Sequence, residues 1–325
     1  MRGTAEKGFL LESTDVICYN HHMKHYDFER LASALGFARV YFTEPMRFDF
    51  ISGKEYNLVM DAKSAFPFAS CIAVLVYPYA PFDADERIPA YYLASNAAYH
   101  ACKGLVAELN QLGVHAERAD VPLKSQLLSA GVGVRCKNSL VALSGYGTRM
   151  VLQALAIDVL EPLEYDETDK ECGKCNACVM ACPALAIGEK GLNVSKCMRA
   201  SMETADHPNW VKQLQRTYIG CEICQYACPR NAGIESTVPS KEQREAFDTR
   251  KLIAGETKKA RDLVGRNKTS NGKLTAEAIS MAARDEKAFF GIYADELKRA
   301  QASEFPAVQD ALRYAESIGN RNNED

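Results

Sequence analysis

Eight cysteines fall within 57 consecutive residues of this 325-residue chain, and this density constrains its structure more than any other feature. The N-terminal sequence lacks the apolar stretch that directs export, and the longest apolar run, residues 71–79, is about half of the roughly 18 residues that a membrane span requires. We therefore expect a cytoplasmic protein with no membrane segment. In reducing cytosol, a dense group of cysteines binds metal more often than it forms disulfides.

The spacing of these cysteines indicates iron-sulfur clusters. Cys172-x2-Cys175-x2-Cys178-x3-Cys182-Pro183 matches the bacterial ferredoxin run, whose fourth cysteine binds the other cluster. The second run, Cys221-x2-Cys224-x3-Cys228-Pro229, lacks a first cysteine, which Cys197 can replace. We predict two 4Fe-4S clusters, with ligands Cys172, Cys175, Cys178 and Cys228 for one and Cys182, Cys197, Cys221 and Cys224 for the other. Paired zinc sites are the alternative, although they need no proline after each run.

The remaining sequence divides into a first half of strands and helices and a helical end. Apolar spacing predicts helices over residues 28–36 and 89–113, and strands over 38–42, 71–77 and 139–144. The stretch 149–160 fits either a helix or a strand, so periodicity leaves α/β and α+β architectures open. Shifts in composition place a first domain over 1–165, a cysteine-rich domain over 166–240 and a helical region over 241–325.

Several smaller features bear on partners. The chain has no P-loop and no dinucleotide fingerprint, so we expect an external low-potential electron donor such as a ferredoxin or a flavodoxin. Residues 241–273 hold ten Lys or Arg and five acidic residues, enough to contact phosphates, although a solvated helix face is the commoner explanation. His21, His22 and His25 form a weak metal-like pattern. Of the isolated cysteines Cys18, Cys71, Cys102 and Cys136, only Cys136 has basic neighbours, Arg135 and Lys137, that favour a thiolate.

Segments upstream of the cysteines add a family resemblance. The chain resembles the epoxyqueuosine reductases, and more distantly the reductive dehalogenases, from about residue 28 to residue 235. The matching segments are Tyr77-Pro78-Tyr79, Arg87 to Tyr92, Ala98-Tyr99-His100, Ala130 to Gly133, Lys137-Asn138, Tyr146 to Arg149 and Lys196-Cys197. Val134-Arg135-Cys136 stands where the family usually has a tryptophan-containing stretch.

This resemblance implies an α+β fold, with a nitroreductase-like N-terminal domain, a bacterial ferredoxin-like two-cluster domain and a short helical C-terminal region. It implies a cobalamin between the first two domains, bound by Tyr91, Tyr92, His100, Lys137, Asn138 and Ser144. The implied substrate is the epoxide of a modified wobble base, which makes tRNA a candidate partner, and Asp120 would be the catalytic acid. An electron-transfer protein that activates another corrinoid protein and a dehalogenase-like reductase of a small molecule remain alternatives.

Overall fold

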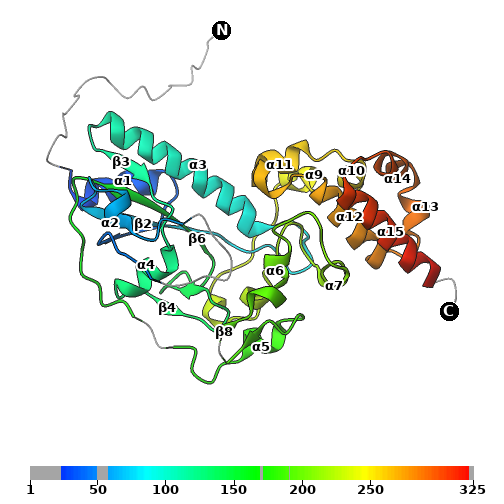
Figure 1. Ribbon diagram of the computed structural model, residues 1–325, viewed down its shortest axis with the longest axis horizontal. Helices are drawn as coiled ribbons and strands as arrows, with labels where there is room; N and C mark the ends of the chain where they lie inside the picture. Colours follow the sequence, from blue (N-terminus) through cyan, green and yellow to red (C-terminus); the bar gives the residue numbers. More distant parts are fainter. Residues whose placement is uncertain (1–22, 50–57, 169–170, 190, 322–325) are drawn as a thin grey trace, which may run out of the picture.

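The computed structural model describes residues 23–49, 58–168, 171–189 and 191–321 (Figure 1). A sheet with its covering helices forms one lobe, the C-terminal helices form a second lobe, and the cysteine-rich segment lies below and between them (Figure 1). His21, His22 and Cys18 lie outside the described residues. No helix in the described part of the chain has the length and apolar character needed to cross a bilayer.

A four-stranded antiparallel sheet forms the centre of the first lobe. Its strands are β1 (Arg39–Thr43), β2 (Cys71–Pro78), β3 (Ala116–Arg118) and β6 (Met150–Ile157), in the order β1-β2-β6-β3. Successive side chains of β2 enter two different apolar cores: Cys71, Ala73 and Leu75 face one, while Ile72, Val74 and Val76 face the other. Burial on both faces explains why β2 is an unbroken apolar run.

Helices cover both faces of this sheet. On one face lie α1 (His25–Ala34) and the 22-residue α3 (Ala90–Gln111), which buries Ala94, Ala98, Cys102, Leu105 and Leu109. α3 begins after Pro89 and is followed by Gly113, whose φ of 81° suits the end of a helix. The other face carries α2 (Ala62–Ala65) and α4 (Leu123–Ser129). The helices predicted over 28–36 and 89–113 are therefore confirmed.

The sequence prediction for residues 139–160 needs refinement. Only Val141–Ala142 of the predicted strand forms β5, which pairs with β4 (Val134–Arg135) as a short hairpin. The ambiguous stretch 149–160 contains β6, which pairs with both β2 and β3. All neighbouring strands of the main sheet are antiparallel, so the fold mixes helices with an antiparallel sheet.

Short elements carry the cysteine-rich segment. They are α5 (Ala177–Ala181), β7 (Ile187–Gly188), β8 (Gly191–Leu192), η1 (Val194–Lys196), α6 (Met198–Ser201), α7 (Asn209–Leu214), α8 (Ile223–Tyr226) and η2 (Pro229–Asn231). The helices have at most six residues, so bonds among side chains and to neighbouring lobes must hold this segment in place.

The second lobe consists of helices: α9 (Lys241–Ala246), α10 (Thr249–Ile253), α11 (Lys258–Val264), η3 (Arg266–Lys268), α12 (Lys273–Asp285), α13 (Phe289–Ile292), α14 (Ala294–Gln301) and α15 (Pro306–Arg321). Every residue of α12 from Lys273 to Ala283 is buried. Leu274, Ile279 and Met281 belong to the same apolar core as Leu105 of α3. The helical lobe is therefore joined to the sheet lobe by continuous packing.

Candidate functional site

The structure divides the eight clustered cysteines into two sets. In the first set, Cys228 interacts with Cys172 and Cys175, and Cys178 interacts with Cys172, Cys175 and Cys228. In the second set, Cys221 interacts with Cys182 and Cys197, and Cys224 interacts with Cys197 and Cys221. Cys224 also interacts with Cys178, so the two sets adjoin, and the ligand assignment from the motif spacing stays a prediction. Among the described residues, no three His, Cys, Asp or Glu side chains converge on a position for one metal ion.

Two Cys-Pro steps explain why each run contributes to both sets. Cys182 ends α5 with a ψ of 109°, and Cys228 precedes η2 with a ψ of 119°. Proline disfavours helical backbone in the residue before it, so Pro183 and Pro229 hold these two cysteines extended. The extended backbone directs Cys182 away from its own run and towards Cys221.

Exposure varies within the first set, where Cys178 is buried, and is intermediate throughout the second set. Cys175 of the first set is exposed, whereas Cys221 and Cys224 of the second set lie in an apolar environment that raises the pKa of each thiol to about 12. Burial also raises the pKa of Cys178 and Cys228. Thiols in such surroundings become thiolates only when a cation compensates the charge, which a cluster's iron atoms would do.

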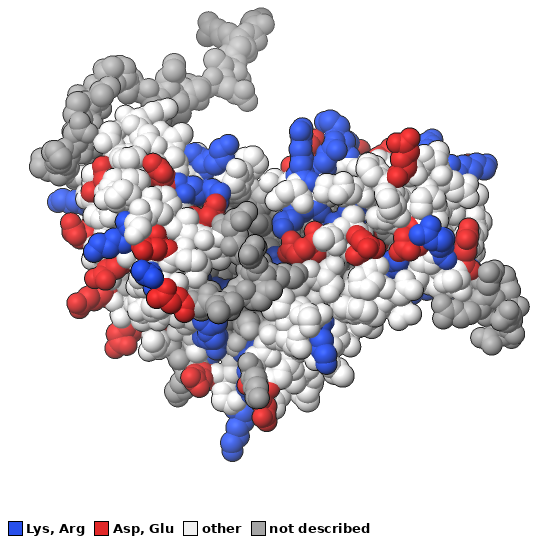
Figure 2. All heavy atoms as spheres, in the orientation of Figure 1, with Lys and Arg blue, Asp and Glu red and all other residues white. Residues whose placement is uncertain are grey.

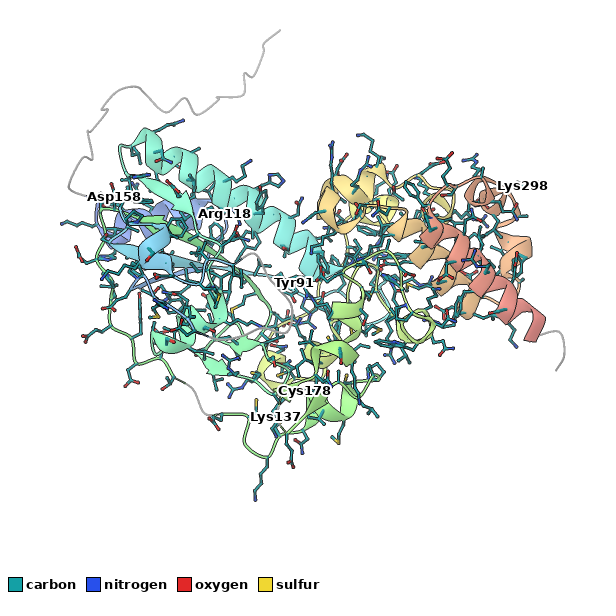
Figure 3. The ribbon with its side chains drawn as sticks, in the orientation of Figure 1. Tyr91, Arg118, Lys137, Asp158, Cys178 and Lys298 are labelled. Atoms are coloured by element: carbon teal, nitrogen blue, oxygen red, sulfur yellow. The ribbon has the colours of Figure 1, made fainter. Side chains whose placement is uncertain are left out.

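The turn between β4 and β5 contacts both sets. Cys172 packs against Cys136, and Lys137 Nζ donates to the carbonyls of Gly173 and Cys175 at 2.9 and 2.8 Å. Lys137 and Cys178 are labelled together at the base of the molecule in Figure 3. Asn138 is buried beside Cys224, and its Nδ2 has no oxygen acceptor. An unpartnered N–H donor beside a ligand-type sulfur fits an iron-sulfur cluster, whose sulfurs accept hydrogen bonds.

A buried ion pair fixes the helix that carries the second run. Glu222, between Cys221 and α8, pairs with the buried Arg149 at the start of β6. Glu222 Oε1 also accepts a 3.0 Å hydrogen bond from the backbone N–H of Tyr91. The Arg149 guanidinium lies 4.4 Å from the ring centroid of Tyr226. These contacts lock the second cysteine set against the sheet and the start of α3.

A cavity of about 620 Å³ lies between α3 and the segment formed by α11 and η3. Tyr92, Asn96, Tyr99 and His100 line one wall, and Gln153 of β6 contributes from the sheet. The opposite wall contains three cations: Arg261, Arg266 and Lys268. Figure 2 shows Lys and Arg side chains on both sides of the notch between the two lobes. The volume is typical of a ligand pocket.

Tyr92 connects this cavity to the second cysteine set. A Cβ atom at Gly220 would lie 2.7 Å from Tyr92 Cε2, so the ring rests directly on the backbone beside Cys221. Arg199, two residues after Cys197, lies 5.7 Å from the ring centroids of Tyr91 and Tyr92. In Figure 3, Tyr91 is labelled at the junction of the lobes. The second set is thus separated from the cavity by one layer of side chains.

Asp120, the predicted catalytic acid, does not line the cavity and is linked to it only through Arg118. Its side chain is 50% exposed and accepts two hydrogen bonds from Arg118, at 2.5 and 2.6 Å. The Arg118 guanidinium lies 5.4 Å from the ring centroid of Tyr99, which lines the cavity. A carboxyl group that acts as a proton donor is ordinarily buried, because burial raises its pKa. The observed carboxylate is instead partly solvated and held by a cation.

The predicted cofactor-binding residues fall into different places. Tyr92 and His100 line the cavity, and Tyr91 stands between the cavity and Glu222. Lys137 and Asn138 contact the cysteine sets, while Ser144 is exposed in the turn after β5. Sequence reasoning missed the cavity residues Asn96 and Gln153, whereas Arg261 belongs to the basic segment 241–273 that it singled out. A spacing of three to four residues from Tyr92 and Tyr99 along α3 could have indicated Asn96.

Two smaller predictions also change. Cys136 was expected to favour a thiolate because of its basic neighbours, but burial raises the pKa of its thiol to about 12. The ammonium group of Lys137 donates hydrogen bonds to carbonyls of the first cysteine run, so its charge is engaged with these carbonyls. His25 interacts through Nε2 with the Glu161 carbonyl at 2.8 Å and stacks edge-on against Phe42.

Comparison with known proteins first defines the class of the cysteine-rich segment. The family described as a 4Fe-4S double cluster binding domain matches residues 171–231. The segment is therefore similar to double-cluster iron-sulfur domains, and this match favours the iron-sulfur prediction over paired zinc sites.

The relatives then narrow the comparison. The epoxyqueuosine reductase of Lactococcus garvieae is 37% identical over 110 residues, 33% of this chain and 31% of the relative. That of Leadbetterella byssophila is 30% identical over 170 residues, 48% of this chain and 56% of the relative. The matches thus span between about a third and about half of the curated relatives' length.

Solved structures extend the similarity to the fold. The epoxyqueuosine reductase of Streptococcus thermophilus superposes with a TM-score of 0.69 at 19% identity, covering 91% of this chain and 90% of that one. A solved epoxyqueuosine reductase with an epoxyqueuosine-modified tRNA stem loop gives 0.63 at 16% identity, covering 91% and 98%. This chain has the mixed helix and sheet fold of epoxyqueuosine reductases and is similar to them in sequence.

Proposed function

We propose that this chain is an iron-sulfur, cobalamin-dependent reductase of the epoxyqueuosine reductase type. The observation that carries the proposal is the cavity beside the second cysteine set, because a simple electron carrier needs no ligand pocket there. When bound, the two clusters supply single electrons and the corrinoid supplies strongly reducing metal chemistry at the substrate. The ligand sets are Cys172, Cys175, Cys178 and Cys228, and Cys182, Cys197, Cys221 and Cys224.

The cavity lining suits a corrinoid in chemical terms. The rings of Tyr92, Tyr99 and His100 offer flat surfaces to a macrocycle. Asn96 and Gln153 can exchange hydrogen bonds with the amide groups at a corrin's edge. Arg261 Nε is buried without a hydrogen-bond partner, so a ligand acceptor at this wall would satisfy it. Of the residues expected to bind the cofactor, Tyr92 and His100 keep that role in this proposal.

The direction of electron flow follows from exposure. Cys175 is exposed, so the first set is the side on which an external ferredoxin or flavodoxin can deliver electrons. Cys178 of the first set interacts with Cys224 of the second, which keeps the two ligand sets adjacent. The second set adjoins Tyr92 and the cavity. The chain thus arranges a donor side, two ligand sets and a reaction site in sequence, consistent with a cytoplasmic enzyme.

The proposed substrate is the epoxide of epoxyqueuosine in tRNA. Its conversion to an alkene consumes two electrons and two protons and releases the oxygen as water. Arg261, Arg266 and Lys268 place cations where the phosphates of an RNA loop could lie. When its pairing with Arg118 loosens, Asp120 would take up a proton from solvent and deliver it to the leaving oxygen, and water would supply the second proton.

A turnover assay tests this function. Cluster-loaded protein with cobalamin and a chemical reductant is incubated with epoxyqueuosine-containing tRNA under anaerobic conditions, and the nucleosides are analysed by mass spectrometry. We expect queuosine to form at the expense of epoxyqueuosine, and formation to cease when cobalamin is omitted. Intact epoxyqueuosine with the clusters and cobalamin bound would reject this substrate, and a dehalogenase-like small-molecule reductase would then be the remaining enzyme.

A further inference from the structure

The most unusual feature near the cysteine sets is a ninth cysteine. Cys136 is buried just after β4, in a small apolar core against which Cys172 packs, and it also interacts with Cys228. Both neighbours belong to the first ligand set of the proposed function, on which this inference rests. The other two isolated cysteines in the described residues, Cys71 and Cys102, are buried in the sheet and α3 and interact with none of the eight ligands.

The hairpin holds the Cys136 sulfur in a fixed position. The Cys136 N–H donates to the Leu140 carbonyl at 2.8 Å, and the Ser139 N–H donates to the Cys136 carbonyl at 2.9 Å. Val134, Cys136 and Ala142 form a small apolar core against which Cys172 packs. Lys137 ties the same turn to the first cysteine run through the carbonyls of Gly173 and Cys175.

The surroundings of Cys136 define its chemistry. An apolar pocket disfavours a charged side chain, so Cys136 is present as a thiol with one S–H donor. In this structure the Cys136 sulfur has the Val134 carbonyl as its acceptor, at 4.0 Å, the limit of a hydrogen bond to sulfur. The Cys172 sulfur is the better acceptor once it carries negative charge as a cluster ligand. A hydrogen bond to a ligand sulfur stabilises the more negative, reduced form of a cluster.

We propose that Cys136 tunes the first cluster: its thiol donates a hydrogen bond to the ligand sulfur of Cys172 and so raises the reduction potential of that cluster. Cys136 is a positioning residue and not a ligand, because the two sets already provide four cysteines each. A higher potential at the cluster nearest the exposed Cys175 makes it an easier acceptor for electrons from the donor.

The test compares Cys136→Ala and Cys136→Ser with Cys102→Ala, which removes an equally buried thiol from the core of α3. Iron content is measured first, and each cluster's potential is then determined by anaerobic redox titration followed by electron paramagnetic resonance. With eight irons retained, we expect Cys136→Ala to lower the reduced fraction of one cluster, at fixed potential, by roughly three- to tenfold. Cys136→Ser keeps a donor and should stay close to wild type, as should Cys102→Ala.

Three results are decisive in different ways. Unchanged potentials in Cys136→Ala with all eight irons present would overturn the tuning role. Loss of about four irons from both Cys136 variants would overturn it too, because Cys136 would then be a ligand. Wild-type protein that binds no iron-sulfur clusters under reconstitution would instead reject the proposed function. Should Cys136→Ala not fold, the serine variant decides. A lowered cluster potential in Cys136→Ser but not in Cys102→Ala would contradict the hydrogen-bond mechanism, and wild-type potentials in Cys136→Ser would support it.

Discussion

At the scale of single residues, backbone restrictions decide which cysteine joins which set. Cys182 and Cys228 are the last cysteines of their runs, and each is held extended by the proline that follows. The Cys-Pro step in each run therefore explains why its last cysteine joins the other set. The same scale explains why Glu222 is buried beside Cys221: its carboxylate is matched by the Arg149 guanidinium and the Tyr91 N–H.

Asp120 carries the first residue-scale prediction. Its carboxyl is paired with Arg118, whose guanidinium lies 5.4 Å from the ring centroid of the cavity residue Tyr99, and we propose that it delivers a proton to the leaving oxygen. We expect Asp120→Asn to lower kcat for epoxyqueuosine reduction by about a hundredfold or more, because the amide cannot donate an acidic proton. Cobalamin affinity should stay unchanged, since the substitution preserves size.

A carboxylate on the preceding strand, β3, provides the control. Glu117 is exposed and interacts with His115, so Glu117→Gln should retain wild-type turnover. Undiminished kcat in Asp120→Asn would remove this residue as the proton donor.

At the scale of elements, the sequence predicts what depends on local pattern. The apolar run of β2 and the apolar stripe of α3 are both predicted correctly. Burial on two faces gives a continuous apolar run, and burial along one stripe gives a helical spacing of apolar residues, so both patterns are visible in the sequence. The Cys136–Asn138 turn shows the limit. Family resemblance assigns Lys137 and Asn138 to the corrinoid, but the partners of a turn depend on long-range packing, which here brings them to the cysteine sets. The cavity wall from Arg261 to Lys268 is equally non-local.

Helix α12 supports a prediction about pH. Burial raises the pKa of Glu277 to about 7, and Lys273 opposes the rise. The folded protein therefore keeps a proton on Glu277 that the unfolded chain releases near its ordinary pKa of 4.5, so this residue's contribution to stability is lost as pH rises from 4.5 to 7. His207, 3.6 Å away, acts in the opposite sense: burial lowers its pKa from 6.5 to about 4, and its contribution is lost as pH falls through that range.

Glu277→Gln separates these two effects. Relative to wild type, the variant should gain free energy of unfolding between pH 5.5 and 7, by on the order of 1 to 3 kcal/mol, because it has no proton to lose. Urea unfolding of the cluster-loaded protein measures this difference, and Glu304→Gln, an exposed carboxyl of the same lobe, is the control. A constant difference between Glu277→Gln and wild type across this range would refute the assignment.

At the scale of the whole molecule, one apolar core joins the sheet lobe to the helical lobe, and the cysteine-rich segment is anchored to both. Arg149 and Lys137 reach it from the first lobe, and Lys273 reaches the Met202 carbonyl from α12. This construction holds the cavity walls of α3 and α11 at a fixed separation beside the second cysteine set. The central claim follows: electrons that enter through the clusters are used within this chain.

Anaerobic titration of the cluster-loaded protein with cobalamin, followed by its visible spectrum, tests this claim most directly. The account predicts saturation at about one equivalent per chain. It also predicts loss of binding in Ser95→Trp, which fills the cavity, and retention in Ala107→Trp, which adds the same side chain at an exposed position of α3. Absence of cobalamin uptake by wild-type protein with intact clusters, or wild-type uptake by Ser95→Trp, would contradict it and leave an electron carrier for another protein.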